Sequence, residues 1–213
     1  MQVAALWRYP VKSLRGEALS SAELTVDGIP GDRGLVVHDA GGRLVTARTR
    51  SALLGLPAVL GPGGEALISG RPWDSAEAGE LIEVAAGEGA RLVPAPRPER
   101  FDDTPLLVAT DGALEFLELS DERRLRPNIV LSGVDGLAER DWPGGRLRIG
   151  DAVIKVWHVC ERCVVTTLNP DDPSDQDTGV LRRINETLDK RVALNCSVEA
   201  PGTVAVADSA ELL

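Results

Sequence analysis

The 213-residue chain has few cysteines, few aromatic side chains and a shortage of positive charge, and these shortages exclude whole classes of protein. Three cysteines, an odd number, do not build the disulfide framework of a small secreted domain, so we expect a reducing, cytoplasmic setting. With 23 basic against 33 acidic side chains, the formal net charge is −10. Duplex nucleic acid and anionic membranes both require a basic surface, so we expect neither as a partner.

Long hydrophobic runs are also missing. No stretch approaches the roughly 18 consecutive apolar residues of a transmembrane helix, and we see no charged-then-apolar leader at the start. The hydrophobic fraction of 43% is nevertheless enough for a packed core. We therefore expect a protein of one ordinary domain or two small ones, without a membrane segment.

Glycine and proline are abundant, with 22 and 14 residues, and they divide the chain into short segments. Many of these segments are β-prone or alternate apolar with polar residues, which is typical of strands joined by tight turns. The predicted strands are residues 3–9, 21–26, 34–38, 43–47, 66–69, 80–85, 91–93, 105–109, 128–132, 146–149, 152–159, 164–168, 192–198 and 203–206.

Two segments are predicted to be helical, and a proline-rich segment is predicted to divide the chain. Residues 112–119 follow a Thr-Asp N-cap, and residues 179–191 carry apolar side chains at four-residue spacing. Residues 94–98 contain three prolines, which disfavour both helix and central strand. We therefore expect a β-rich α+β protein with two domains: a small, mostly antiparallel β-barrel domain over 1–96, and a second β-barrel domain with a few short helices over 97–213.

The most specific motif is Cys160-Glu161-Arg162-Cys163, which lies between two predicted strands. Four interpretations are open. A zinc knuckle needs four ligands, and the chain offers only one more cysteine and two histidines without a second paired motif. A thioredoxin-like redox pair should open a helix, whereas the β-branched residues 164–167 favour a strand. The thiols could also be buried small hydrophobes, or one could be a thiolate ligand to a soft-binding metal, with Arg162 lowering its pKa.

Cationic residues gather beside predicted turns in four segments: 9–16, 31–33, 46–48 and 123–128. In a chain of net charge −10, such grouping points to an anion pocket, because Arg and Lys form charge-assisted hydrogen bonds with phosphate. The alternative is that each of them is an ordinary solvated surface charge.

Together these segments resemble the MOSC family, the molybdenum cofactor sulfurase C-terminal domains, and within it the mitochondrial amidoxime-reducing components and their bacterial counterparts. The blocks occur in family order over nearly the whole chain. The N-terminal blocks resemble the MOSC N-terminal β-barrel domain and the later ones the MOSC domain itself. The blocks are LWRYPVKSLRG (6–16), GDRGLVV (31–37), LVTAR (44–48), DDTPLLVATDGAL (102–114), RLRPNIVLSG (124–133), CERCVVTTLNP (160–170), DTGV (177–180) and APGTVAVAD (200–208).

The resemblance implies a molybdenum enzyme in which a pterin-dithiolene cofactor holds the metal and one cysteine completes the sulfur ligation. The matching cysteine is Cys163, and Cys160 would be a neighbour or a packing residue. Asp141, in the family's acidic-then-Trp segment, could relay protons near the metal or be an ordinary solvated loop acid. Cofactor-binding residues carried over from the family are Lys12, Ser13, Arg33, Thr110, Arg126, Asn128 and Arg162, with Arg48 as a weaker candidate.

The function implied is a two-electron reduction of small N-hydroxylated compounds such as amidoximes and hydroxylamines. No dinucleotide-binding glycine motif follows a strand, so we expect electrons to come from a separate donor protein. One alternative is a cofactor carrier or sulfur-transfer module without its own turnover; another is a protein that keeps the fold without molybdenum.

The chain departs from these relatives in four ways. It is shorter, chiefly around residues 50–100, and it carries an acidic insert at 171–177. We also expect neither a C-terminal iron–sulfur extension, because Cys196 is the only cysteine after the motif, nor an N-terminal lipid or membrane anchor. Substrate and donor are the properties that these departures affect most.

Overall fold

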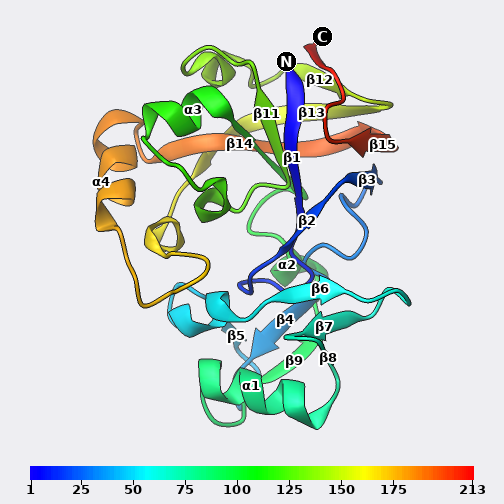
Figure 1. Cartoon of the computed structure of the whole chain (residues 1–213), viewed down its shortest axis with the longest axis vertical. Coiled ribbons are helices and arrows are strands. Elements are labelled where there is room, and N and C mark those ends of the chain that lie inside the picture. The colour runs from blue at the N-terminus through cyan, green and yellow to red at the C-terminus, as the bar shows by residue number, and fades with distance from the viewer.

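The computed structural model describes all residues, 1–213, and confirms a strand-rich α+β protein (Figure 1). The long strands β13 (Ala152–Glu161) and β14 (Arg191–Ala200) cross one end of the molecule, and helix α1 (Ala76–Ala86) lies at the other. The remaining strands are β1 (Gln2–Arg8), β2 (Glu17–Leu19), β3 (Ser21–Leu24), β4 (Leu35–His38), β5 (Leu44–Val45), β6 (Ala58–Leu60), β7 (Ala66–Ile68), β8 (Arg71–Pro72), β9 (Arg91–Pro94), β10 (Leu106–Thr110), β11 (Ile129–Ser132), β12 (Arg146–Ile149), β15 (Gly202–Ala205) and β16 (Ala210–Leu212).

The largest sheet has eight strands in the order β16-β12-β13-β14-β10-β11-β1-β2. Only β10 and β11 pair in parallel; the other neighbours are antiparallel. The order is open, since the end strands β16 and β2 do not pair with each other. Strands β1 and β2 come from the predicted first domain but pair within this sheet, so the division at residue 96 stays a prediction.

Successive residues of a strand point to opposite faces of the sheet. Side chains of the large sheet therefore belong to two hydrophobic cores, one on each face. Val108 of β10 belongs to a cluster of 21 buried residues on one face. Its neighbour Ala109 belongs to a second cluster, where helices α3 (Asp111–Phe116) and α4 (Thr178–Thr187) cover the sheet. The predicted Thr110 N-cap is confirmed, because its hydroxyl accepts a hydrogen bond from the amide of Ala113 at 3.2 Å.

Two small antiparallel sheets, β5-β4-β9 and β6-β7-β8, form the other end of the molecule with α1. The strand predicted at 80–85 is wrong, because this segment lies inside α1. The Ser75 hydroxyl caps the helix at Ala78, and the apolar residues Ala78, Ile82 and Ala85 recur on one face, buried in the local core. A further pair, β15 with β3, joins the C-terminal region to the N-terminal one.

Two other predicted segments differ. Residues 164–168, predicted as a strand, contain the short 3₁₀ helix η4 (Val164–Thr167). The hydroxyls of Thr166 and Thr167 donate to the carbonyls three residues earlier at 2.9 and 2.7 Å, which stabilises a helical turn despite the β-branched side chains. The proline-rich segment contains the single-turn helix α2 (Arg97–Arg100), because proline is tolerated in a first turn.

Three further short 3₁₀ helices complete the chain. The 3₁₀ helices are η1 (Ser51–Gly55), η2 (Glu122–Leu125), η3 (Ala138–Asp141) and η4 above, and the longest α-helix, α1, has 11 residues. None of the helices has the length and apolar character needed to cross a bilayer.

Candidate functional site

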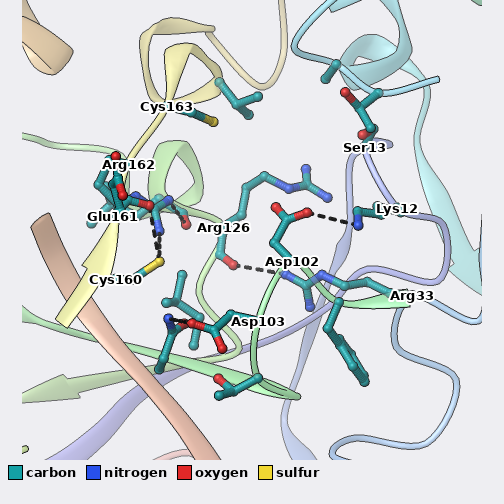
Figure 2. Close-up of a pocket in the computed structure, with 18 of the residues that line it drawn as sticks. Lys12, Ser13, Arg33, Asp102, Asp103, Arg126, Cys160, Glu161, Arg162 and Cys163 are labelled. Atoms are coloured by element: carbon teal, nitrogen blue, oxygen red, sulfur yellow. Dashed lines mark hydrogen bonds and ion pairs between the residues drawn. The ribbon is translucent and has the colours of Figure 1, made fainter. Parts of the chain in front are cut away.

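One cavity of about 280 Å³ collects most of the residues that the sequence singled out (Figure 2). Its walls come from both predicted domains and include both cysteines of the Cys-x-x-Cys motif, Cys160 and Cys163. The other predicted site residues that line it are Lys12, Ser13, Arg33, Arg48, Arg126, Asn128 and Arg162. The structure therefore brings together side chains spread over 150 residues of sequence.

The two cysteines lie on either side of the junction between β13 and η4. Cys160 is near the end of β13, and Cys163 stands immediately before η4 as its N-cap. Arg162 donates from Nη1 to the sulfur of Cys160 at 3.3 Å (Figure 2). Contact with the sulfur of Cys163 raises the pKa of Arg48 above its ordinary value, with Asp102 adding to the effect. Both sulfurs thus have a guanidinium nearby.

The Tyr9 ring organises the cationic wall. The guanidinium of Arg33 lies over the ring at 4.9 Å from its centre, and that of Arg126 lies over it at 4.3 Å. Gly16 permits this arrangement, since a Cβ there would lie 2.5 Å from the Tyr9 ring. The ring is buried, and burial raises the Tyr9 pKa, so the phenol stays neutral and donates to the carbonyl of Pro127.

Two guanidinium groups in this wall have unsatisfied donors. Arg126 Nη2 and Arg162 Nε are buried and have no hydrogen-bond partner. Burial lowers the pKa of Arg126 to about 10, with Arg33 adding to the effect. Buried donors of this kind are costly unless a ligand satisfies them, and the ligand that a guanidinium suits best is a phosphate or carboxylate.

A carboxylate of the protein holds two other cations of the pocket. Asp102 accepts from Lys12 Nζ at 2.9 Å (Figure 2), and it also accepts from Arg48 Nη2 at 2.8 Å. Burial alone would raise the Asp102 pKa, but these two cations hold it below its ordinary value. Lys12 also donates to the carbonyl of Glu99 at 2.7 Å. Asp102 therefore neutralises cations that could bind an external anion.

A second carboxylate, Asp103, lies at the cavity edge beside a histidine. Its Oδ2 is 2.6 Å from His158 Nε2 and 2.8 Å from Asn195 Nδ2. Asp103 and Glu161 also line a neighbouring, more open cavity of about 470 Å³, together with His158, Arg140 and Arg191. The pocket thus has a polar entrance with both charge signs.

Two predicted site residues are not brought to the cavity. Thr110 is fully buried and occupied as the N-cap of α3, and Asp141 is exposed at the end of η3; neither lines the pocket. The structure instead places Asp102, Asp103, Thr104 and Glu161 in the lining. The pair Asp102-Asp103 lies inside a block already quoted for its resemblance, which is the signal that could have found them.

The structure contains no group of three or more His, Cys, Asp or Glu side chains that could hold a metal ion by themselves. The zinc knuckle considered for the cysteine motif is therefore not built here. The pocket offers two thiols with cations around them, and such a set suits only a metal whose other ligands come from a bound organic group.

Comparison with known proteins places these features in a family. The family model described as "MOSC N-terminal beta barrel domain" matches residues 1–67, and the one described as "MOSC domain" matches residues 107–211. The human protein named "Mitochondrial amidoxime-reducing component 1" is 30% identical over 287 aligned positions, covering 99% of this chain and 82% of that protein. The Macaca fascicularis protein named "Mitochondrial amidoxime reducing component 2" is 31% identical, covering 88% of this chain and 70% of its own length.

The alignment with the human relative is longer than this 213-residue chain, so that relative contains insertions that this chain lacks. Among solved structures, the one titled "Crystal Structure of APC1665, YUAD protein from Bacillus subtilis" is similar with a TM-score of 0.55. It covers 99% of this chain and 94% of its own, at 14% identity, and so supports the fold alone.

Proposed function

This chain belongs to the MOSC family, in the group that joins a MOSC N-terminal beta barrel domain to a MOSC domain, and from that premise we propose that it is a molybdenum-cofactor-dependent oxidoreductase. Its substrates are small N-hydroxylated compounds, and its electrons come from a separate donor protein. The relatives named amidoxime-reducing components support this substrate class.

One observation carries the proposal: buried, unpartnered guanidinium donors and two thiols line the same cavity. These residues fit the cofactor, which has an anionic phosphate at one end and a metal held by sulfur at the other. Arg126 and Arg162 supply donors for the anionic end, and Cys163 supplies the protein's thiolate. Further cations and neutral hydrogen-bonding groups for the cofactor come from Lys12, Arg33, Arg48, Ser13 and Asn128.

When bound, the cofactor supplies the two-electron redox centre at which the N–O bond is broken. The chain's own residues bind, orient and protonate. Overall, the substrate takes up two electrons and two protons and releases its hydroxyl oxygen as water. Asp103, at the boundary between the pocket and the outer cavity, is the carboxylate that can hold a proton for that departing oxygen.

The assignment of a protein acid differs from the sequence expectation. Asp141 is exposed and does not line the pocket, so a proton held on its carboxylate has no direct path to a ligand in the cavity. Asp103 lines the pocket itself and is held there by hydrogen bonds from His158 and Asn195. We therefore assign the proton-holding role to Asp103.

A second candidate function is a cofactor carrier or sulfur-transfer module without turnover. The observation that favours it is the second thiol: Cys160 lines the same cavity, and Arg162 donates to its sulfur. A protein that only stores a cofactor or sulfur would use such a thiol and would need no acid at the pocket edge. This candidate predicts loaded protein that reduces nothing.

The test is an activity assay on protein made in a host that synthesises the cofactor. With an artificial reductant, wild-type protein reduces benzamidoxime or hydroxylamine, Cys163→Ser retains pterin without activity, and Cys160→Ser keeps substantial activity. Loaded wild-type protein that reduces none of a panel of N-hydroxylated compounds rejects the oxidoreductase and favours the carrier.

A further inference from the structure

The function proposed above uses His158 only as a hydrogen-bond partner that holds Asp103 in place. His158 lies with Nε2 at 2.6 Å from Asp103 Oδ2, and the amide of Asn195 lies 2.8 Å from the same oxygen and 3.1 Å from the ring nitrogen. In the state in which Asp103 is ionised, its carboxylate only accepts hydrogen bonds, so the ring then donates from Nε2. This leaves Nδ1 as the nitrogen that can exchange a proton with water.

The sheet fixes this cluster. Asn195 on β14 is the cross-strand partner of His158 on β13 and, on its other side, of Leu107 on β10. Asp103 lies three residues before Leu106, the first residue of β10. Three neighbouring strands therefore set the positions of the three side chains, and the register of β13 shifts next to His158.

The cluster spans the boundary between solvent and pocket. The side chains of His158 and Asp103 are 53% and 47% exposed. Asp103 lines both the pocket and the outer cavity, whereas His158 lines only the outer cavity. A proton taken from water at His158 thus has one hydrogen bond to cross before it reaches a carboxylate that faces the pocket.

We propose that His158 is the positioning residue that holds Asp103 toward the pocket and returns a proton to it after each transfer. This inference rests on the proposed function, because reduction of an N–OH group consumes two protons per molecule of water released. Protonated Asp103 gives its proton to the departing oxygen and becomes a carboxylate. His158, protonated on both ring nitrogens, then passes its Nε2 proton to Asp103 Oδ2, and the neutral ring takes up one proton from solvent, which restores the starting state. The electrons come from the external reductant.

Other charged groups face the same ring in the outer cavity. They are the carboxylate of Glu161 and the guanidinium groups of Arg140 and Arg191, which line that cavity with His158 and Asp103. Arg140 is fixed by donation to the backbone carbonyl of Arg191 at 2.9 Å. The pH dependence of the reaction rate therefore reflects all these charged groups. The experiments below isolate the part that depends on the contact between His158 and Asp103.

The experiment uses the loaded full-length protein and two substitutions at one position. His158→Gln can still donate to Asp103 but cannot carry a proton through a ring, and His158→Ala removes both abilities. We expect His158→Gln to lower kcat on the order of 10²-fold at high pH, with little change in KM or molybdenum content. The wild-type rate should fall as the pH rises, and in His158→Gln this part of the pH profile should disappear. Added imidazole should restore part of the activity of His158→Ala.

The control is the only other histidine. His38 is also paired with a carboxylate, Nε2 to Glu99 Oε2 at 2.6 Å, but it lines neither cavity. His38→Gln keeps the wild-type pH profile. If His158→Gln also does, or if it fully restores what His158→Ala loses, a proton-carrying role is overturned and only orientation remains.

A second readout needs no turnover. NMR of the two imidazole rings should show the His158 titration midpoint moving to lower pH in Asp103→Asn, with the His38 ring unchanged; an unmoved His158 ring overturns the shared proton. A loaded wild-type protein that reduces no N-hydroxylated compound rejects the proposed function instead, and the ring titration then still decides the His158–Asp103 coupling.

Discussion

The guanidinium of Arg126 stacks on the Tyr9 ring at 4.3 Å from its centre, and its Nη2 is buried without a partner. Stacking on the ring holds the guanidinium in place without using any of the N–H donors of Arg126. Its left-handed backbone, with φ of 55°, shows that the surrounding structure holds Arg126 in this strained position. The strained backbone and the buried donor without a partner both support the proposed role of Arg126 in binding the cofactor.

Arg126→Gln should therefore impair retention of the proposed cofactor. Removing one charge-assisted hydrogen bond in a buried pocket costs about 1.5–3 kcal/mol, or roughly 10- to 100-fold in affinity. We expect pterin content per chain after gel filtration to fall correspondingly, measured by fluorescence of the oxidised pterin. Arg43→Gln, on an exposed hairpin turn, is the matched control. Equal pterin content in the two variants contradicts the assignment.

Asp102→Asn should strengthen anion binding by cofactor-free protein. The substitution releases Lys12 Nζ and Arg48 Nη2 from the carboxylate that neutralises them. We expect the affinity for inorganic phosphate to rise about 10-fold, as measured by isothermal titration calorimetry. Asp74→Asn changes net charge equally but lies outside the pocket lining, so it should leave the affinity unchanged. An equal rise in both variants indicates a net-charge effect only.

Asp103→Asn and Asp141→Asn separate the two carboxylates that could act as the acid. Asp103 lines the pocket and Asp141 does not. Loss of a proton-transfer group lowers rates by about 10²–10⁴-fold, so Asp103→Asn should fall in that range. Asp141→Asn should keep near wild-type kcat. Steady-state assays at saturating substrate measure kcat for both variants. A large loss in Asp141→Asn together with near wild-type kcat in Asp103→Asn would make Asp141 the acid.

Glu139→Gln should change how stability depends on pH. Glu139 is fully buried with no partner for either carboxylate oxygen, and burial raises its pKa above the usual value near 4.5. The folded protein therefore holds this proton more tightly than the unfolded chain does, and stability is lost as pH rises from the usual Glu value through the raised one.

Glutamine stays neutral, so this variant should escape that loss. We expect the Tm of Glu139→Gln to exceed that of the wild type at pH 7 to 8, and the difference to shrink as the pH falls toward the usual Glu value. Thermal melts at several pH values provide the measurement, with Glu115→Gln on an exposed face of α3 as control. A Tm difference between wild type and Glu139→Gln that does not grow with pH contradicts this prediction.

The sequence predicts best where the determining interactions are local. The hairpin of β4 and β5 and the Thr110 cap of α3 each depend on a turn or a side chain within a few residues, and the structure confirms them. The segment 80–85 misled because it is short and mostly apolar and has a glycine close to each end, Gly79 and Gly87, as a strand between two turns often does. The Ser75 cap and the spacing of Ala78 and Ile82 were the helix signals, and they lie partly outside that segment.

The site shows the same division. Lys12, Arg33 and Arg126 stand beside predicted turns in segments that resemble a family, so the sequence singles them out. The pairing of Asp103 with His158 depends on the register of β10, β14 and β13, which bring together residues remote in sequence. No local pattern carries that information, and the same holds for the stacking of two arginines on Tyr9.

The most direct measurement is the molybdenum content of intact wild-type protein and of Cys163→Ser, both made in a host that synthesises the cofactor and analysed by elemental mass spectrometry alongside pterin fluorescence. We predict about one molybdenum per chain in the wild type, and little molybdenum but retained pterin in Cys163→Ser. Wild-type protein that contains neither molybdenum nor pterin, or a Cys163→Ser variant that holds the metal as firmly as the wild type, would contradict the role of this pocket.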